Sequence, residues 1–202
     1  LQQYFDNTWT ITEVLFSGLQ GEDAFYRPPY HDLRHPLIFY YGHPAVLYVN
    51  KLRVAGLLKD PINPFFESLF ETGVDEMSWD DLSKNKMKWP AVEEVRMYRK
   101  QVYDAITKII QSLTDEQVKS IGLDSPLWAL VMGFEHERIH IETSSFLMNE
   151  IKDVNTLRFP DHFPKYHESI SLDVNKVNRD PVAGKDYPIN DMIEVPASEV
   201  HL

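Results

Sequence analysis

The sequence of 202 residues contains no cysteine. This absence excludes a disulfide scaffold and any metal site with thiolate ligands. It also means that any sulfur chemistry here would use a sulfur atom of the substrate. Basic residues are scarce too: 20 Lys and Arg stand against 31 Asp and Glu, which gives a formal net charge of -11. Because a phosphate backbone would be repelled, we expect no nucleic-acid partner.

Long apolar runs and targeting signals are also missing. No stretch approaches the roughly 20 apolar residues that span a bilayer, so we expect no membrane partner. The first six residues lack the basic start and the apolar core of a secretory signal. Together with the absence of cysteine, this favours a cytoplasmic protein. The composition, 43% hydrophobic and 25% charged, is that of an ordinary globular domain.

Apolar residues recur with helical spacing in four stretches, at 8–19, 36–58, 90–113 and 125–151. A shorter helix is predicted at 64–70. No stretch alternates polar and apolar residues over a convincing length, so a core built on a sheet is not expected. The sequence therefore predicts an all-α fold, most simply an up-and-down four-helix bundle with long loops.

The character of the sequence changes after residue 157. Residues 158–190 are rich in proline, histidine and asparagine without a period, which is typical of a linker or an irregular C-terminal arm. Residues 192–202 are predicted to begin the first strand of another domain, and the chain stops there. We therefore divide it into a helical domain, 1–157, and an arm, 158–202.

His136 and His140 lie four residues apart in the last predicted helix. They therefore stand on one helical face and can hold a single metal ion. Glu137 lies about 80° from the direction of the two histidines, close enough to accept a hydrogen bond from a ligand imidazole. Glu142 lies roughly 140° away, so it cannot easily bind the ion. It is expected to pair with a neighbouring helix or to orient a group around the site.

His43 is the candidate for a third ligand. It lies in the most apolar predicted helix, where an imidazole without a partner would be costly. A metal ion would satisfy it, and the alternative is a core histidine bonded to a neighbour. Three neutral imidazoles from two helices would leave positions on the ion open for substrate and for oxygen or water. The remaining histidines are expected to be surface or capping residues, His31 and His35, or inert residues of the tail, His162, His167 and His201.

The letters His136-Glu137-x-x-His140 also spell the zinc-peptidase motif, in which the glutamate is a general base. The extended form of the motif fails, because Thr143 and Phe146 occupy the positions of its glycine and third histidine. No strand is expected that could hold an extended peptide. The peptidase hypothesis therefore lacks its structural context.

Three stretches carry a resemblance to a known family: 37–48 around His43, 57–81, and 128–145 around the histidine pair. They resemble the amino-terminal domain of the 5-histidylcysteine sulfoxide synthases of ovothiol biosynthesis, relatives of the ergothioneine sulfoxide synthases. The similarity extends roughly from Thr8 to the end of the chain. It implies a DinB-like four-helix bundle that holds one non-haem Fe(II). The positions that match the three iron ligands of the family are His43, His136 and His140.

The resemblance also implies an activity and partners. The family reaction joins the sulfur of cysteine to the imidazole carbon of histidine and oxidises it to a sulfoxide, with O₂ as oxidant. Family members continue into a sulfatase-modifying-factor-like domain that supplies most substrate contacts and a catalytic tyrosine, and 193–200 resembles its opening strand. A second domain of the same polypeptide is therefore an expected partner. Residues 1–202 alone are expected to bind iron and to turn over slowly or not at all.

Two further functions stay open. A stand-alone DinB-like thiol transferase or hydrolase would use zinc or nickel at the same three histidines, a ligand set that also suits copper. A non-catalytic helical module would keep the histidines as structural residues.

Overall fold

A computed structural model of the chain describes residues 1–31, 34–71, 88–158, 182, 184 and 189. The chain divides into two compact units, Leu1–Asp161 and His162–Leu202. The first unit contains every helix of the described residues, and the second lies almost wholly outside them. The helices are α1 (Gln2–Phe16), α2 (Asp23–Tyr26), α3 (Leu37–Val54), α4 (Pro64–Leu69), α5 (Val92–Gln111), α6 (Asp115–Lys119) and α7 (Trp128–Asn149).

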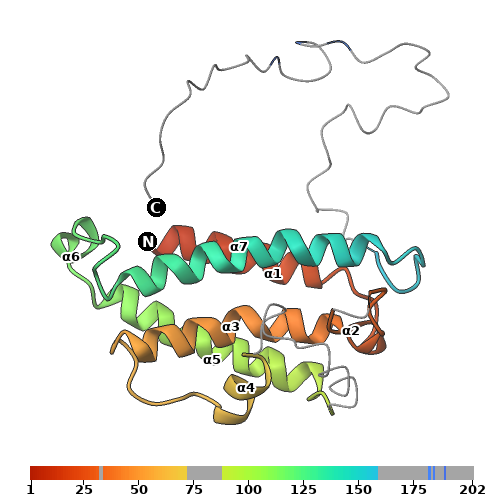
Figure 1. The fold of residues 1–202 in the computed structure, drawn as a ribbon, viewed down its shortest axis with the longest axis horizontal. Helices are drawn as coiled ribbons and strands as arrows, with labels where there is room; N and C mark the ends of the chain where they lie inside the picture. The colour runs from red at the N-terminus through yellow and green to blue at the C-terminus, as the bar shows by residue number, and fades with distance from the viewer. Residues whose placement is uncertain (32–33, 72–87, 159–181, 183, 185–188, 190–202) are drawn as a thin grey trace, which may run out of the picture. The chain divides into compact units, whose positions relative to one another are not determined.

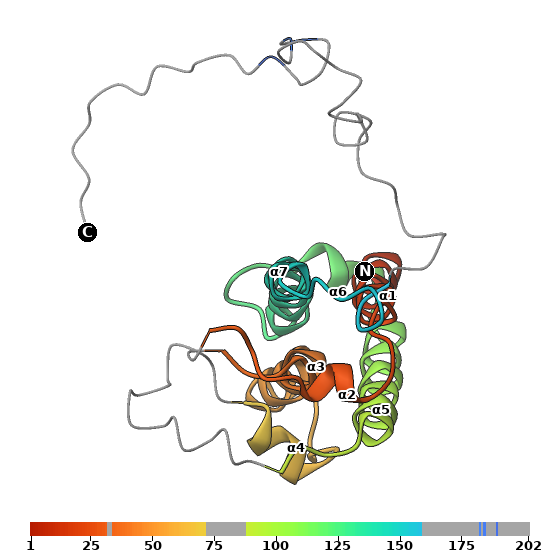
Figure 2. The ribbon, with the colours of Figure 1, turned by 90° about the vertical axis from the view of Figure 1, so that its right-hand side faces the viewer.

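The four long helices form a bundle in which α7 packs between α1 and α3, and α5 closes the ring on the other side (Figures 1 and 2). The described residues contain no strand, and their one isolated bridge joins Leu19 to Leu157. The predicted all-α four-helix bundle is therefore confirmed.

The order of helix directions corrects the predicted up-and-down topology. Gln2 at the start of α1 bonds Thr107 near the end of α5, and Glu13 near the end of α1 bonds Arg99, so α5 runs opposite to α1. Figure 1 shows α7 running in the direction of α1, and α3 in the direction of α5. The directions are thus up-down-down-up instead of alternating, because the chain that contains α4 returns to the end of the bundle where α3 began.

Apolar spacing explains the long helices. The buried residues of α5 recur every three or four positions, at Val92, Val95, Tyr98, Arg99, Val102, Ile106 and Ile110, so a single face points to the core. Helix α3 is buried over most of its length and continues through Pro44. The N-terminus of the short helix α4 is capped. The Asn63 side chain accepts hydrogen bonds from the N–H groups of Phe65 and Phe66, and proline occupies the first helical position.

The predicted helix boundaries need correction mainly in α1. This helix begins at Gln2 instead of residue 8, because Phe5 is completely buried and its turn belongs to the core. It ends at Phe16, before Gly18. Each of the other long helices is one to four residues shorter at each end than predicted, and α2 and α6 were not predicted. The arm at 158–202 and its strand at 192–202 lie almost wholly outside the described residues, so the division at 157 stays a prediction.

Within the described ranges, no helix combines the length and the apolar character needed to cross a bilayer.

Candidate metal centre

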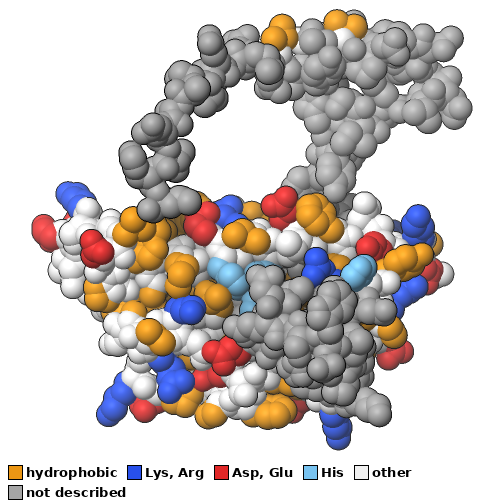
Figure 3. All heavy atoms as spheres, viewed as in Figure 1, with side chains coloured by type: hydrophobic (Ala, Val, Ile, Leu, Met, Phe, Trp, Pro, Cys, Tyr) orange, Lys and Arg blue, Asp and Glu red, His pale blue; other side chains and the backbone are white. Residues whose placement is uncertain are grey.

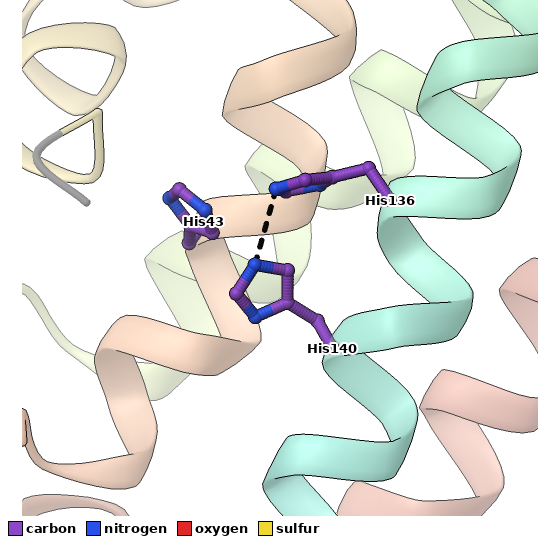
Figure 4. A group of neighbouring side chains, drawn as sticks. All are labelled: His43, His136 and His140. Atoms are coloured by element: carbon purple, nitrogen blue, oxygen red, sulfur yellow. Dashed lines mark hydrogen bonds between the residues drawn. The ribbon is translucent and has the colours of Figure 1, made fainter. Parts of the chain in front are cut away.

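The three predicted ligands lie together in the structure. His43 projects from α3, and His136 and His140 project one turn apart from α7, with the three rings directed toward one another (Figure 4). One ligand atom from each ring lies within 4.8 Å of the others. The ring centroids are 4.4–5.0 Å apart. The spacing of four on α7 and the antiparallel packing of α3 against it bring the rings to one point.

His43 is fixed in orientation by the backbone. Its Nδ1–H donates to the carbonyl oxygen of Phe70, at an N···O distance of 2.6 Å. Its ring stacks on Phe39 with the centroids 5.0 Å apart. Because Nδ1 carries the proton, Nε2 keeps the lone pair and can bind a metal, which is the usual way in which a neighbouring acceptor orients a histidine ligand.

His136 and His140 present their Nε2 atoms to each other at 3.1 Å. Two nitrogens bound to one ion at about 2.0–2.1 Å also lie roughly 3 Å apart, so the rings already have the separation of ligands to a common ion. The Nδ1 atoms of both rings are buried and have no hydrogen-bond partner among the described residues. The pair is therefore poorly satisfied by the protein alone.

The environment keeps all three rings uncharged. Burial, together with the neighbouring His43 ring, lowers the pKa of His136 to about 3. Burial and the other two histidines lower the pKa of His140 to about 3. Burial also lowers the pKa of His43, against the opposing effect of its bond to Phe70. Neutral imidazoles have the free lone pairs that a metal requires.

The residues present therefore fit a metal ion. Three neutral nitrogen donors suit Fe(II), zinc, nickel and copper, and they leave coordination positions open for other molecules. His43 is buried, whereas His136 and His140 are partly exposed. Figure 3 shows histidine side chains at the surface in this view, with hydrophobic side chains nearby. One ligand is thus anchored in the core, and two are partly exposed.

Glu137 points away from the three rings, into the bundle. Its side chain is completely buried. Its carboxylate accepts hydrogen bonds from Thr12 at 2.9 Å, Tyr48 at 3.0 Å and Arg99 at 3.3 Å. A carboxylate held in this way cannot act as a general base beside the histidines. The zinc-peptidase hypothesis is therefore excluded by geometry, and the predicted role of Glu137 as a partner of a ligand imidazole has no contact to support it.

The remaining predicted residues have varied positions. Glu142 is exposed on α7, and its role stays a prediction. His31 is exposed. His35, expected at the surface or in a cap, is instead 3% exposed. The loop before α3 folds against that helix, and the His35 ring packs on Phe39 at 4.3 Å between centroids. The tail histidines, His162, His167 and His201, lie outside the described residues.

Sequence reasoning missed two groups that hold side chains in or next to the site, one bonded to His43 and one to Glu137. The Phe70 carbonyl that orients His43 belongs to the backbone, and no sequence signal marks it. Arg99 did have a signal: it occupies the apolar face of α5, four residues after Val95 and three before Val102. A cation at such a position indicates a buried carboxylate partner.

Comparison with known proteins agrees with this structure. The chain is 27% identical over 199 residues to "Ergothioneine biosynthesis protein 1" of Neurospora crassa, an alignment that covers 95% of this chain and 20% of that protein. The chain therefore spans about a fifth of the length of this relative. The DinB superfamily profile matches residues 4–144, which include all or most of each of the four long helices and the three histidines. The chain is thus a distant relative of the Neurospora protein, and by the length of this match it belongs to the DinB superfamily.

Proposed function

We infer that this domain holds the Fe(II) of an O₂-dependent sulfoxide synthase, which joins the sulfur of cysteine to the imidazole carbon of histidine or of a histidine derivative. The observation that carries the proposal is the group of three neutral histidines at a partly exposed face of a DinB-type bundle. The distant relation to "Ergothioneine biosynthesis protein 1" supports this chemistry over that of other metal-dependent DinB-like proteins. The reaction is proposed for a polypeptide that contains this domain.

The residues of the chain have defined tasks in this proposal. His43, His136 and His140 would hold the ion through neutral nitrogens, so the site keeps the positive charge that attracts a thiolate. The Phe70 carbonyl holds the proton of His43 at Nδ1 and so fixes which nitrogen faces the ion. When bound, Fe(II) would bring the thiolate and O₂ together and supply the redox chemistry.

The reaction balances without another reductant. The thiol S–H and the imidazole C–H bonds break, and a carbon–sulfur bond forms. One oxygen atom of O₂ becomes the sulfoxide oxygen, and the other leaves as water with the two hydrogens. O₂ accepts all four electrons. The product mass is therefore that of cysteine plus the imidazole substrate plus one oxygen, less two hydrogens.

The test is oxygen consumption by the chain after anaerobic loading with Fe(II), with cysteine and either histidine or trimethylated histidine. We expect O₂ uptake that needs both substrates, and a product of the stated mass. The variant His136→Ala is the control for iron bound elsewhere. The imidazole compound that supports uptake identifies the acceptor.

Other outcomes would change the assignment. Stoichiometric iron without uptake in this chain, but with uptake in a longer polypeptide, would agree with the expectation that residues 1–202 turn over slowly. Iron without product in either form would contradict the synthase proposal. Tight binding of zinc or nickel with thiol transfer or hydrolysis would favour the alternative DinB-like activity.

A further inference from the structure

A buried ionic cluster lies directly behind the metal-binding face of α7. Its centre is the carboxylate of Glu137, which is 0% exposed, and its cation is Arg99 on α5, which is 1% exposed. Thr12 of α1 and Tyr48 of α3 donate to the same carboxylate. A single side chain of α7 is thus bonded to each of the other three long helices.

Burying such charges is expensive unless every group is paired. Arg99 meets this condition: its Nε donates to Glu13 at 2.8 Å, its Nη1 to the carbonyl oxygen of Tyr41 at 2.9 Å, and its Nη2 to Glu137. Its guanidinium also lies over the Trp9 ring at 4.2 Å. The Tyr41 carbonyl and the Trp9 ring hold the guanidinium independently of Glu13, and its Nη2 is directed at Glu137.

We propose that Glu137 is a positioning residue for the metal, and that its bonds to Arg99 and Tyr48 set the placement of α7 that brings the two histidines of this helix to His43. This inference concerns the metal centre, and it holds whichever reaction the centre supports.

The position of Glu137 on the helix supports this role. It follows His136 directly and precedes His140 by three residues, so it belongs to the turn that carries both ligands. Because the backbone bonds of a helix make that turn rigid, any rotation or shift of residue 137 moves both imidazoles. Metal–ligand distances tolerate changes of only about 0.2 Å.

Tyr48 joins the two helices that provide ligands. Its hydroxyl on α3 donates to Glu137 on α7, and its ring lies against Gly133 of α7. A Cβ atom at residue 133 would come within 2.3 Å of this ring, so the helices approach as closely as glycine allows. The distance between α3 and α7 is therefore set beside the metal site and by the same cluster.

Glu13 provides a matched control. It shares Arg99 with Glu137, bears the same charge, and accepts a second bond from Tyr41 at 2.8 Å. It lies on α1, which carries no ligand. If the cluster served only stability, the metal affinity of each variant would follow its stability, whichever glutamate is changed.

The experiment compares the variants Glu137→Gln, Tyr48→Phe and Glu13→Gln of the full chain with Co(II) as the probe. The Co(II) dissociation constant is measured by competition with a chelator, the Co(II) absorption spectrum reports ligand geometry, and thermal unfolding of the metal-free protein reports stability. For Glu137→Gln and Tyr48→Phe we expect about 10–100-fold weaker binding and an altered spectrum. Glu13→Gln should lose stability but keep the affinity and spectrum of the wild type.

Three results would overturn the proposal: unchanged affinity and spectrum in Glu137→Gln, an equal loss of affinity in Glu13→Gln, or a loss that follows only the stability of each variant. If Glu137→Gln does not fold, Tyr48→Phe decides the question, because it keeps every charge and removes one hydrogen bond. Absence of Co(II) binding by the wild type would refute the metal centre itself and is distinguishable from these outcomes.

Discussion

At the scale of single residues, the site depends on histidines that the fold keeps uncharged. The rings of His136 and His140 are buried far enough to lower the pKa of each to about 3, well below the ordinary value of 6.5. The unfolded chain can protonate these residues near neutral pH, and the folded chain cannot. The histidines that suit a metal therefore make the metal-free protein sensitive to acid.

This difference predicts how the stability of the metal-free protein depends on pH. Between about pH 6.5 and 3 the unfolded state binds more protons than the folded state, so the free energy of unfolding falls as the pH falls. Above about pH 6.5 both states leave these two rings neutral, so the histidines no longer reduce the free energy of unfolding. We expect the urea midpoint, measured with a chelator present, to drop between pH 7.5 and 5.5. The double variant His136→Leu/His140→Leu should lose less over the same interval. An equal loss in both proteins would contradict this assignment.

Prediction of single residues from the sequence succeeded where the geometry of one helix determines which side chains share a face. The helical spacing of His136 and His140, and the apolar surroundings of His43, were enough to bring three candidates to one site, and the structure places them together. The direction of Glu137 was not predictable. Its angle on the helix allowed contact with a ligand ring, but its partner is Arg99, 38 residues away in the sequence. Contacts between distant segments of a chain leave no periodic signal.

At the scale of elements, the close approach of α3 to α7 determines whether the three metal ligands meet. Tyr48 and Gly133 are in direct contact between these helices, and the same pair of helices holds all three metal ligands. The sequence predicted both helices and most of their lengths from apolar spacing. It could not predict that the glycine of α7 faces a tyrosine ring of α3.

The substitution Gly133→Ala tests this contact. The new Cβ would lie 2.3 Å from two atoms of the Tyr48 ring, which is completely buried in the core. We expect a loss of about 1–3 kcal/mol in the free energy of unfolding, as in other overpacked cores, together with weaker metal binding. Chemical unfolding and a Co(II) titration measure the two effects.

Gly122→Ala is the matched control, since no atom lies within 4 Å of the point that a Cβ would occupy there and its backbone is not in the left-handed region. Its stability should stay close to that of the wild type or rise slightly. If Gly133→Ala behaved in the same way, the close approach of α3 and α7 would not be needed for stability or for metal binding.

At the scale of the whole molecule, metal binding and folding should be coupled. The three ligands come from two helices far apart in the sequence, so the unfolded chain offers no preformed site. The up-down-down-up order of the helices was beyond sequence prediction, because the apolar pattern of a helix is the same in either direction. Yet this order makes α3 antiparallel to α7 and sets which of their residues meet.

This coupling predicts that the melting temperature rises with the concentration of free metal. At a concentration 100 times the dissociation constant the stabilisation should reach about 2.7 kcal/mol. Differential scanning calorimetry over a series of Co(II) concentrations measures the effect. The variant His43→Ala should show no such rise, and a comparable rise in that variant would place the bound metal elsewhere.

The most direct test of the central claim is an anaerobic titration of the chain with Fe(II), followed by measurement of the iron retained per chain. The wild type should retain one equivalent, and each of the variants His43→Ala, His136→Ala and His140→Ala should retain almost none while remaining folded. The exposed His31→Ala should bind iron like the wild type. Absence of iron in the wild type, or undiminished iron in the three variants, would contradict the assignment of these histidines as a metal centre.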